Sequence, residues 1–90
     1  MYRIEFLQEA TKGALKLRKS EKQAYKKLEK LLQELEEHPD TGTGKPEPLS
    51  GNRAGQWSRR ITQKHRLIYK IHEDVVMVLI ISVYGHYDDK

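Results

Sequence analysis

A run of residues near the C-terminal end, Val75 to Ser82, is apolar at every position except the last. β-Branched residues are frequent in this run, and they favour strands. A strand that is apolar on both faces belongs inside a sheet with helices packed on it, not at an edge. The chain has 90 residues, which is too few for two separate hydrophobic cores. We therefore predict one domain, residues 1–90, organised around this strand.

Periodicity predicts one strand and two helices in the first half of the chain. Apolar and polar residues alternate over residues 2–7, which is typical of a strand with one covered face. Residues 8–19 favour a short helix. Residues 20–38 show the stronger pattern, in which a capping box at Ser20–Gln23 precedes apolar residues at spacings of three and four, until Pro39 ends the helix.

The second half predicts three strands. Residues 40–52 concentrate glycine and proline and are expected to form a loop or linker. Strands are expected at residues 57–62, 66–72 and 75–82. The order β-α-α-β-β-β predicts an α+β domain with both helices packed on one small, mostly antiparallel, four-stranded sheet.

Several classes of protein are excluded by what the sequence lacks. Cysteine is absent, so disulfides, thiolate zinc sites and cysteine nucleophiles are excluded. The absence of cysteine is also compatible with a protein of a reducing compartment. The N-terminus has no signal-peptide core, and no apolar run approaches the roughly 20 residues that span a bilayer. We expect a cytoplasmic protein without a membrane segment.

Basic residues are unevenly distributed. Residues 1–44 hold nine basic and eight acidic side chains, whereas residues 45–87 hold seven basic and three acidic ones. The second half is basic mainly through arginines, whose guanidinium groups match phosphate oxygens in pairs. Charge alone leaves two interpretations open, a polyanion partner and a solubilising surface.

The motifs disfavour three common kinds of site. The loop Gly42-Thr43-Gly44-Lys45 lacks the spacing, the following Ser or Thr and the helix of a phosphate-binding loop. The four histidines show no paired spacing for a metal ion, and no serine lies in a nucleophile motif. We therefore expect neither a metal site nor covalent catalysis.

The remaining polar residues suit phosphodiester chemistry. Glu47 lies between two prolines, Arg66 lies in a predicted strand, and His86 and Tyr87 follow the last strand. A carboxylate can take a proton, an arginine can hold a phosphate, and a histidine can give a proton near neutral pH. Taken singly, each also fits a plain role as a solvated acid, a cross-strand ion pair or an exposed side chain.

Four segments together resemble the YoeB (Txe) toxins of the RelE/ParE superfamily. They are GKPEPL at 44–49, GQWSRRIT at 55–62, HRLIY at 65–69 and the pair His86-Tyr87. The resemblance is close over residues 44–87 and extends to length and helix arrangement over residues 1–43. It implies a RelE-like fold and the toxin of a type II toxin–antitoxin module, a ribosome-dependent mRNA endonuclease that needs no cofactor.

The resemblance also assigns roles position by position. Glu47 matches the general base, Arg66 the phosphate-contacting arginine, His86 the general acid, and Tyr87 the aromatic residue that orients or stacks. The expected RNA-contacting residues are Lys45, Arg59, Arg60 and Tyr84. Whether Arg60 and Arg66 share one face of the sheet stays open, because one residue more or less in the intervening loop reverses the alternation.

The implied partners are a YefM-like antitoxin and mRNA in the A site of the 70S ribosome. An acidic antitoxin with an apolar helix or strand would cover the basic half and the exposed apolar surface of a small core. A homodimer and a toxin–antitoxin hetero-oligomer are both compatible with the resemblance.

The sequence departs from the family pattern at Tyr84, Lys64 and Ser50, and it continues past Tyr87 with Asp88-Asp89-Lys90. These departures put auxiliary basic contacts in doubt and leave Glu47, Arg66, His86 and Tyr87 in place. Two alternatives remain, a ParE-like toxin that poisons a topoisomerase without cutting, and a basic RNA-binding module. A general base, an anion-binding group and a general acid together favour the nuclease.

Overall fold

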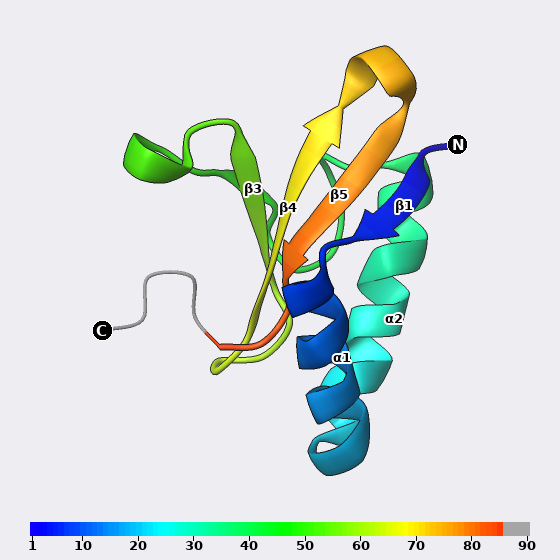
Figure 1. Cartoon of the computed structure of the whole chain (residues 1–90), viewed down its shortest axis with the longest axis vertical. Helices are drawn as coiled ribbons and strands as arrows, with labels where there is room; N and C mark the ends of the chain where they lie inside the picture. Colours follow the sequence, from blue (N-terminus) through cyan, green and yellow to red (C-terminus); the bar gives the residue numbers. More distant parts are fainter. Residues whose placement is uncertain (86–90) are drawn as a thin grey trace.

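Strand β5 (Met77–Ser82) runs through the interior of the sheet, as its apolar sequence predicts. The structure is a computed structural model, which describes residues 1–85. The sheet has the order β1-β5-β4-β3-β2, in which β1 is parallel to β5 and the other pairs are antiparallel. Figure 1 shows β1, β5, β4 and β3 side by side in this order. The other elements are β1 (Arg3–Phe6), α1 (Gln8–Ser20), α2 (Lys22–Glu37), β2 (Glu47–Pro48), β3 (Gln56–Arg60) and β4 (Arg66–His72), with 3-10 turns η1 (Gly51–Arg53) and η2 (Glu73–Val75).

The sheet has five strands, so the prediction of four was wrong. The extra strand, β2, lies in the segment that glycine and proline content had marked as a loop. Glu47 pairs with Ser58 and Pro48 with Trp57. A proline, which has no N–H to donate, is tolerated at such an edge position. Two residues of the predicted loop, Glu47 and Pro48, are therefore part of the sheet.

Several predicted boundaries also differ. Strand β3 ends at Arg60 and not at residue 62, because Ile61 and Thr62 donate to the His65 carbonyl in the turn that leads to β4. Strand β5 begins after η2, and Val76 adopts a left-handed backbone with φ 50°. The Ser20 hydroxyl donates to the Lys16 carbonyl at 2.8 Å and does not cap the second helix. Glu21 separates the two helices, and its carboxylate contacts a distant residue instead, His65.

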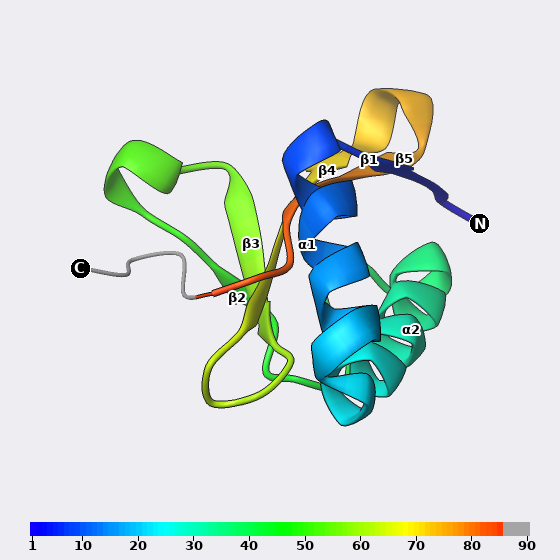
Figure 2. The ribbon, with the colours of Figure 1, turned by 60° about the horizontal axis from the view of Figure 1, so that its bottom comes forward.

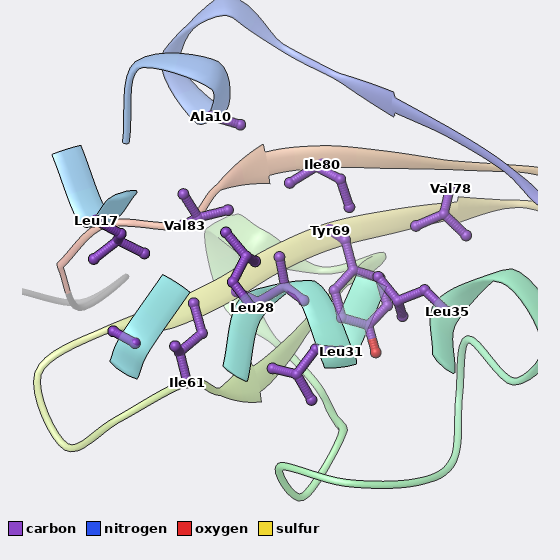
Figure 3. Packing of buried hydrophobic residues seen from close by; sticks show 12 residues of the cluster. Ala10, Leu17, Leu28, Leu31, Leu35, Ile61, Tyr69, Val78, Ile80 and Val83 are labelled. Carbon is purple, nitrogen blue, oxygen red and sulfur yellow. The ribbon is translucent and has the colours of Figure 1, made fainter. Parts of the chain in front are cut away.

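Both helices pack on the same face of the sheet (Figure 2). Leucines of α2 meet the inward side chains of β4 and β5, and Tyr69 lies among them (Figure 3). The largest buried apolar side chains are Leu17, Leu28, Leu31, Leu35, Leu67, Ile68, Tyr69, Val78, Ile80 and Val83. Among residues 1–85, no α-helix packs on the opposite face of the sheet, which we call the helix-free face. Within residues 1–85, no helix has the length and apolar content to cross a membrane.

Candidate functional site

The strand register brings three of the predicted site residues to the helix-free face. Glu47 is opposite Ser58, and Arg60 is opposite Arg66. Directly paired residues point to the same face, and so do residues two apart on one strand. Glu47 is therefore a diagonal neighbour of Arg60, and both arginines share its face. The register question that the sequence left open is settled in favour of one shared face.

Arg60 and Arg66 form a pair of like charges across two strands. Such pairs are destabilising unless something balances them. Among residues 1–85, no carboxylate or other group forms an ion pair or hydrogen bond with either side chain. Arg60 is exposed and Arg66 is half-buried. Two neighbouring guanidinium groups without an acid are suited to hold an anion such as a phosphate.

Glu47 is held by its backbone while its carboxylate stays open to solvent. Its side chain is exposed and has no partner among the residues that the structure describes. The flanking prolines restrict the backbone, and Leu49 N–H donates to the Gln56 carbonyl at 2.9 Å. An exposed carboxylate on a restricted backbone, diagonal to Arg60, can accept a proton from a bound ligand.

The loop before Glu47 carries backbone strain. Lys45 has φ 52°, a left-handed conformation that costs energy for any residue with a side chain. Gly44 precedes it with φ 85°, and a Cβ there would lie 2.9 Å from the Arg60 carbonyl oxygen. Arg60 N–H donates to the Gly44 carbonyl at 2.7 Å. The strained loop thus docks on the end of β3, with the exposed Lys45 in it.

The chain beyond β5 returns to Arg66. Arg66 N–H donates to the Gly85 carbonyl at 2.9 Å. Gly85 is the last described residue, and the predicted site residues His86 and Tyr87 lie outside the described residues.

Arg59 does not lie with the other candidate RNA-binding residues. Its side chain is fully buried on the helix side of β3. It makes five hydrogen bonds, to the Glu34 carboxylate, to the Tyr69 hydroxyl, and to the carbonyls of His38, Thr41 and Thr43. Burial raises the pKa of Tyr69, although Arg59 opposes that rise. The expectation that Arg59 contacts RNA therefore conflicts with the structure, in which it ties α2 and the following loop to the sheet.

Tyr84 lies beside α1. Its ring centroid is 4.6 Å from that of His65, and the Lys16 ammonium lies 4.9 Å from the ring centroid. Tyr84 as a whole residue is 43% exposed. Tyr84 and Lys16 together form a cation–π contact that no sequence motif indicated.

A polar hollow adjoins Glu47, formed by β2, η1 and the start of β3. Arg53 donates to the Gln56 side-chain oxygen at 3.0 Å within it. Its lining residues are Glu47, Pro48, Leu49, Ser50, Asn52, Arg53 and Gln56. No sequence motif predicted this hollow, because β2 itself was not predicted. Among residues 1–85, no three His, Asp or Glu side chains gather as metal ligands would.

These features define a class of protein. A small α+β domain with two helices on a mixed sheet has a RelE/YoeB-like fold, found in toxins of bacterial toxin–antitoxin systems. Residues 6–87 match the family described as "YoeB-like toxin of bacterial type II toxin-antitoxin system". The chain belongs to this family.

Individual relatives agree over nearly the whole chain. Toxin YoeB of Streptomyces coelicolor is 35% identical over 85 residues, which cover 94% of this chain and 99% of the relative. A YoeB/ParE toxin from Agrobacterium tumefaciens superposes with a TM-score of 0.89 at 29% identity, covering 94% and 99% of the two chains. The YoeB–YefM complex from Staphylococcus aureus superposes with a TM-score of 0.82 at 32% identity, covering 97% of this chain and 99% of that chain. YoeB from that organism has also been solved as a dimer, with a TM-score of 0.83, 32% identity and coverage of 96% and 98%.

Proposed function

We propose that this toxin is a metal-independent endoribonuclease that cuts mRNA in the A site of the 70S ribosome and thereby inhibits translation. The observation that carries the proposal is the pair Arg60 and Arg66, directly opposite across two strands and without an acid among the described residues. Glu47 is diagonal to Arg60 on the same face. A doubly cationic anion site next to an unpaired carboxylate suits cleavage of a phosphodiester.

The proposed reaction uses the 2′-hydroxyl of the RNA as nucleophile. Glu47 takes its proton, and the 2′-oxygen attacks the adjacent phosphorus. Arg66, with Arg60 beside it, stabilises the negative charge that develops on the phosphorane oxygens. In this proposal His86 protonates the leaving 5′-oxygen and Tyr87 orients the phosphate or stacks on a base. The products are a 2′,3′-cyclic phosphate and a 5′-hydroxyl end.

We extend the proposal to the partners. The family places this chain in a toxin–antitoxin system, so we propose a YefM-like antitoxin as its inhibitor. A hetero-oligomer with that antitoxin and a homodimer of the free toxin are both included, since S. aureus YoeB has been solved in both forms. Exposed apolar side chains offer such a partner surface to cover, and they are Phe6, Leu7, Leu15, Val75, Val76 and Tyr84. Because the proposed substrate is mRNA on the ribosome, we propose that the toxin acts in the cytoplasm.

The decisive experiment adds purified toxin to 70S ribosomes that translate a defined mRNA. Cut sites are mapped by primer extension for the wild type, Glu47→Gln, His86→Gln and Lys70→Gln. Lys70 is the matched control, because it is an exposed cation on the same face of the sheet, beyond the site. We expect cuts in the A-site codon with the wild type and the control, and a rate lower by about 10²- to 10⁴-fold in the other two variants.

Other outcomes distinguish the alternatives. Intact mRNA in every sample would reject the nuclease, and a supercoiling assay with a topoisomerase would then test a ParE-like activity. Salt-sensitive RNA binding without cutting would favour an RNA-binding module. Cutting that survives both substitutions would keep the nuclease and reject the proposed site.

A further inference from the structure

Both polar groups of the Gly85 backbone are held by two consecutive residues. Gly85 N–H donates to His65 Nδ1 at 2.8 Å, and Arg66 N–H donates to the Gly85 carbonyl at 2.9 Å. His65 is 1% exposed, so its ring cannot exchange this partner for water without the local packing opening. The segment that follows β5 is thereby fixed next to the backbone of Arg66.

The hydrogen bond from Gly85 determines the tautomer of His65. Because Nδ1 accepts a hydrogen bond from the Gly85 N–H, the ring proton lies on Nε2. Nε2 then donates to the Glu21 carboxylate at 2.9 Å. Lys64 Nζ lies 3.9 Å from the same carboxylate, and the Tyr84 ring packs on His65. A chain of contacts therefore runs from the junction of α1 and α2 through His65 to Gly85.

The conformation of Gly85 agrees with this arrangement. Its φ is 81°, a left-handed value that a glycine adopts without strain. A Cβ at this position would meet no atom of the described residues within 4 Å. Glycine is thus required by the backbone conformation and not by lack of space. That conformation directs the N–H toward His65 and the carbonyl toward Arg66.

We propose that His65 is a positioning residue for the nuclease site and that Glu21 orients its ring. His65 fixes the backbone at Gly85 next to that of Arg66, and the chain continues from Gly85 to His86. His65 does not touch the RNA in this scheme, because it is buried and both of its ring nitrogens are engaged within the protein. The catalytic consequence rests on the proposed function, whereas the fixed Gly85 backbone does not.

Two variants separate the two hydrogen bonds of His65. In His65→Asn, the side-chain oxygen is as many bonds from the backbone as Nδ1, so it can still accept from Gly85. In His65→Gln, the side-chain nitrogen matches Nε2 and can still donate to Glu21, but no acceptor faces Gly85. The two variants thus remove opposite ends of the chain of contacts, and thermal denaturation verifies that both are folded.

The first readout is the rate of amide hydrogen exchange at Gly85, which NMR measures on the free toxin. We expect slow exchange in the wild type and in His65→Asn, and fast exchange in His65→Gln. The second readout is kcat and KM for ribosomal cleavage. We expect kcat to fall by about 10- to 100-fold in His65→Gln at unchanged KM, the loss typical of a small misplacement. His65→Asn should stay close to the wild type.

The results that overturn the inference are equally specific. Fast Gly85 exchange in the wild type would remove its basis, and so would an equal loss of kcat in both variants. Loss of Gly85 protection in His65→Gln at wild-type kcat would show that the fixed backbone is irrelevant to cleavage. If the wild type cuts no mRNA while the exchange pattern holds, the proposed function fails and the positioning of Gly85 by His65 is supported.

Discussion

Adjacent arginines in β3 have opposite roles, because successive side chains of a strand point to opposite faces. Arg59 turns toward the helices and is fully buried, and Arg60 turns away and is exposed. A charged side chain is buried only where partners satisfy it. For Arg59 these partners come from α2, from residues 38–43 and from Tyr69 on β4. Arg60 has none among the described residues.

The hydrogen bonds of Arg59 predict that lysine cannot replace it. Lysine carries its donors on one atom and cannot reach the separate acceptors that a guanidinium fork contacts. We expect Arg59→Lys to lower the free energy of unfolding by about 2–3 kcal/mol, because buried acceptors lose their donors. Urea denaturation measures the change. Arg60→Lys is the matched control and should stay within about 0.5 kcal/mol of the wild type; equal effects at both positions would contradict the assignment.

Glu34 predicts a pH dependence of stability. Burial alone would raise the pKa of Glu34, but hydrogen bonds from Thr43 and Arg59 lower it below its ordinary value of 4.5. A carboxylate with a lowered pKa stabilises the fold above its unfolded-state pKa, and this contribution disappears as the pH falls through the folded-state pKa. The stability difference between the wild type and Glu34→Gln should therefore be largest near neutral pH and shrink below pH 4.5. Denaturant titrations across this range measure it, and a constant difference would contradict the prediction.

At the scale of elements, the periodicity of apolar residues predicted those helices and strands that a short stretch of sequence specifies by itself. The spacing of apolar residues in α2 and the apolar run of β5 each specify an element without reference to the rest of the chain. Strand β2 could not be found in this way, because it is two residues long and exists only through pairing with β3. Nor could alternation determine the register of Arg60 and Arg66. The backbone hydrogen bonds that Ile61 and Thr62 donate to the His65 carbonyl set it.

The contact between α1 and the segment after β5 leads to a prediction at Gly13. Alanine in place of a helix-interior glycine ordinarily stabilises by about 0.5–1 kcal/mol. Here a Cβ would lie 3.0 Å from both Tyr84 Cβ and Val83 Cγ2. These atoms lie close to the backbone, so α1 or the segment must shift, at a cost of about 1–3 kcal/mol. We expect Gly13→Ala to lower the melting temperature.

A control in the same helix isolates the packing effect of Gly13→Ala. Thr11 is exposed, and alanine there gains helix propensity without meeting a neighbour. Thr11→Ala should therefore hold or raise the melting temperature. The packing argument is wrong if both substitutions raise it.

For the whole molecule, the family motif predicted the fold, whereas the face that Glu47, Arg60 and Arg66 share follows only from the strand register. Glu47 and Arg60 are exposed and Arg66 is half-buried on the helix-free face. The burial of Arg59 on the helix side of the sheet could not be predicted, and neither could the hydrogen bonds that link Glu21, His65 and Gly85. They depend on which side chains from distant parts of the chain meet in the folded core.

The charge of the helix-free face predicts how RNA binding depends on salt. Each phosphate of a single strand that a basic side chain neutralises contributes about −0.7 to the slope of log K against log salt concentration. If Arg60 and Arg66 hold phosphates, Arg60→Gln should weaken binding and make the slope shallower by about 0.7. Fluorescence anisotropy measures this with a short RNA that carries a 2′-deoxyribose at the cut site, so that binding is separated from cleavage. Lys30→Gln on α2 is the control, because Lys30 is an exposed cation on the helix layer. Equal slopes for the wild type and Arg60→Gln would mean that the arginine pair holds no phosphate, whereas loss of slope in the Lys30 variant would place the RNA on the helix layer.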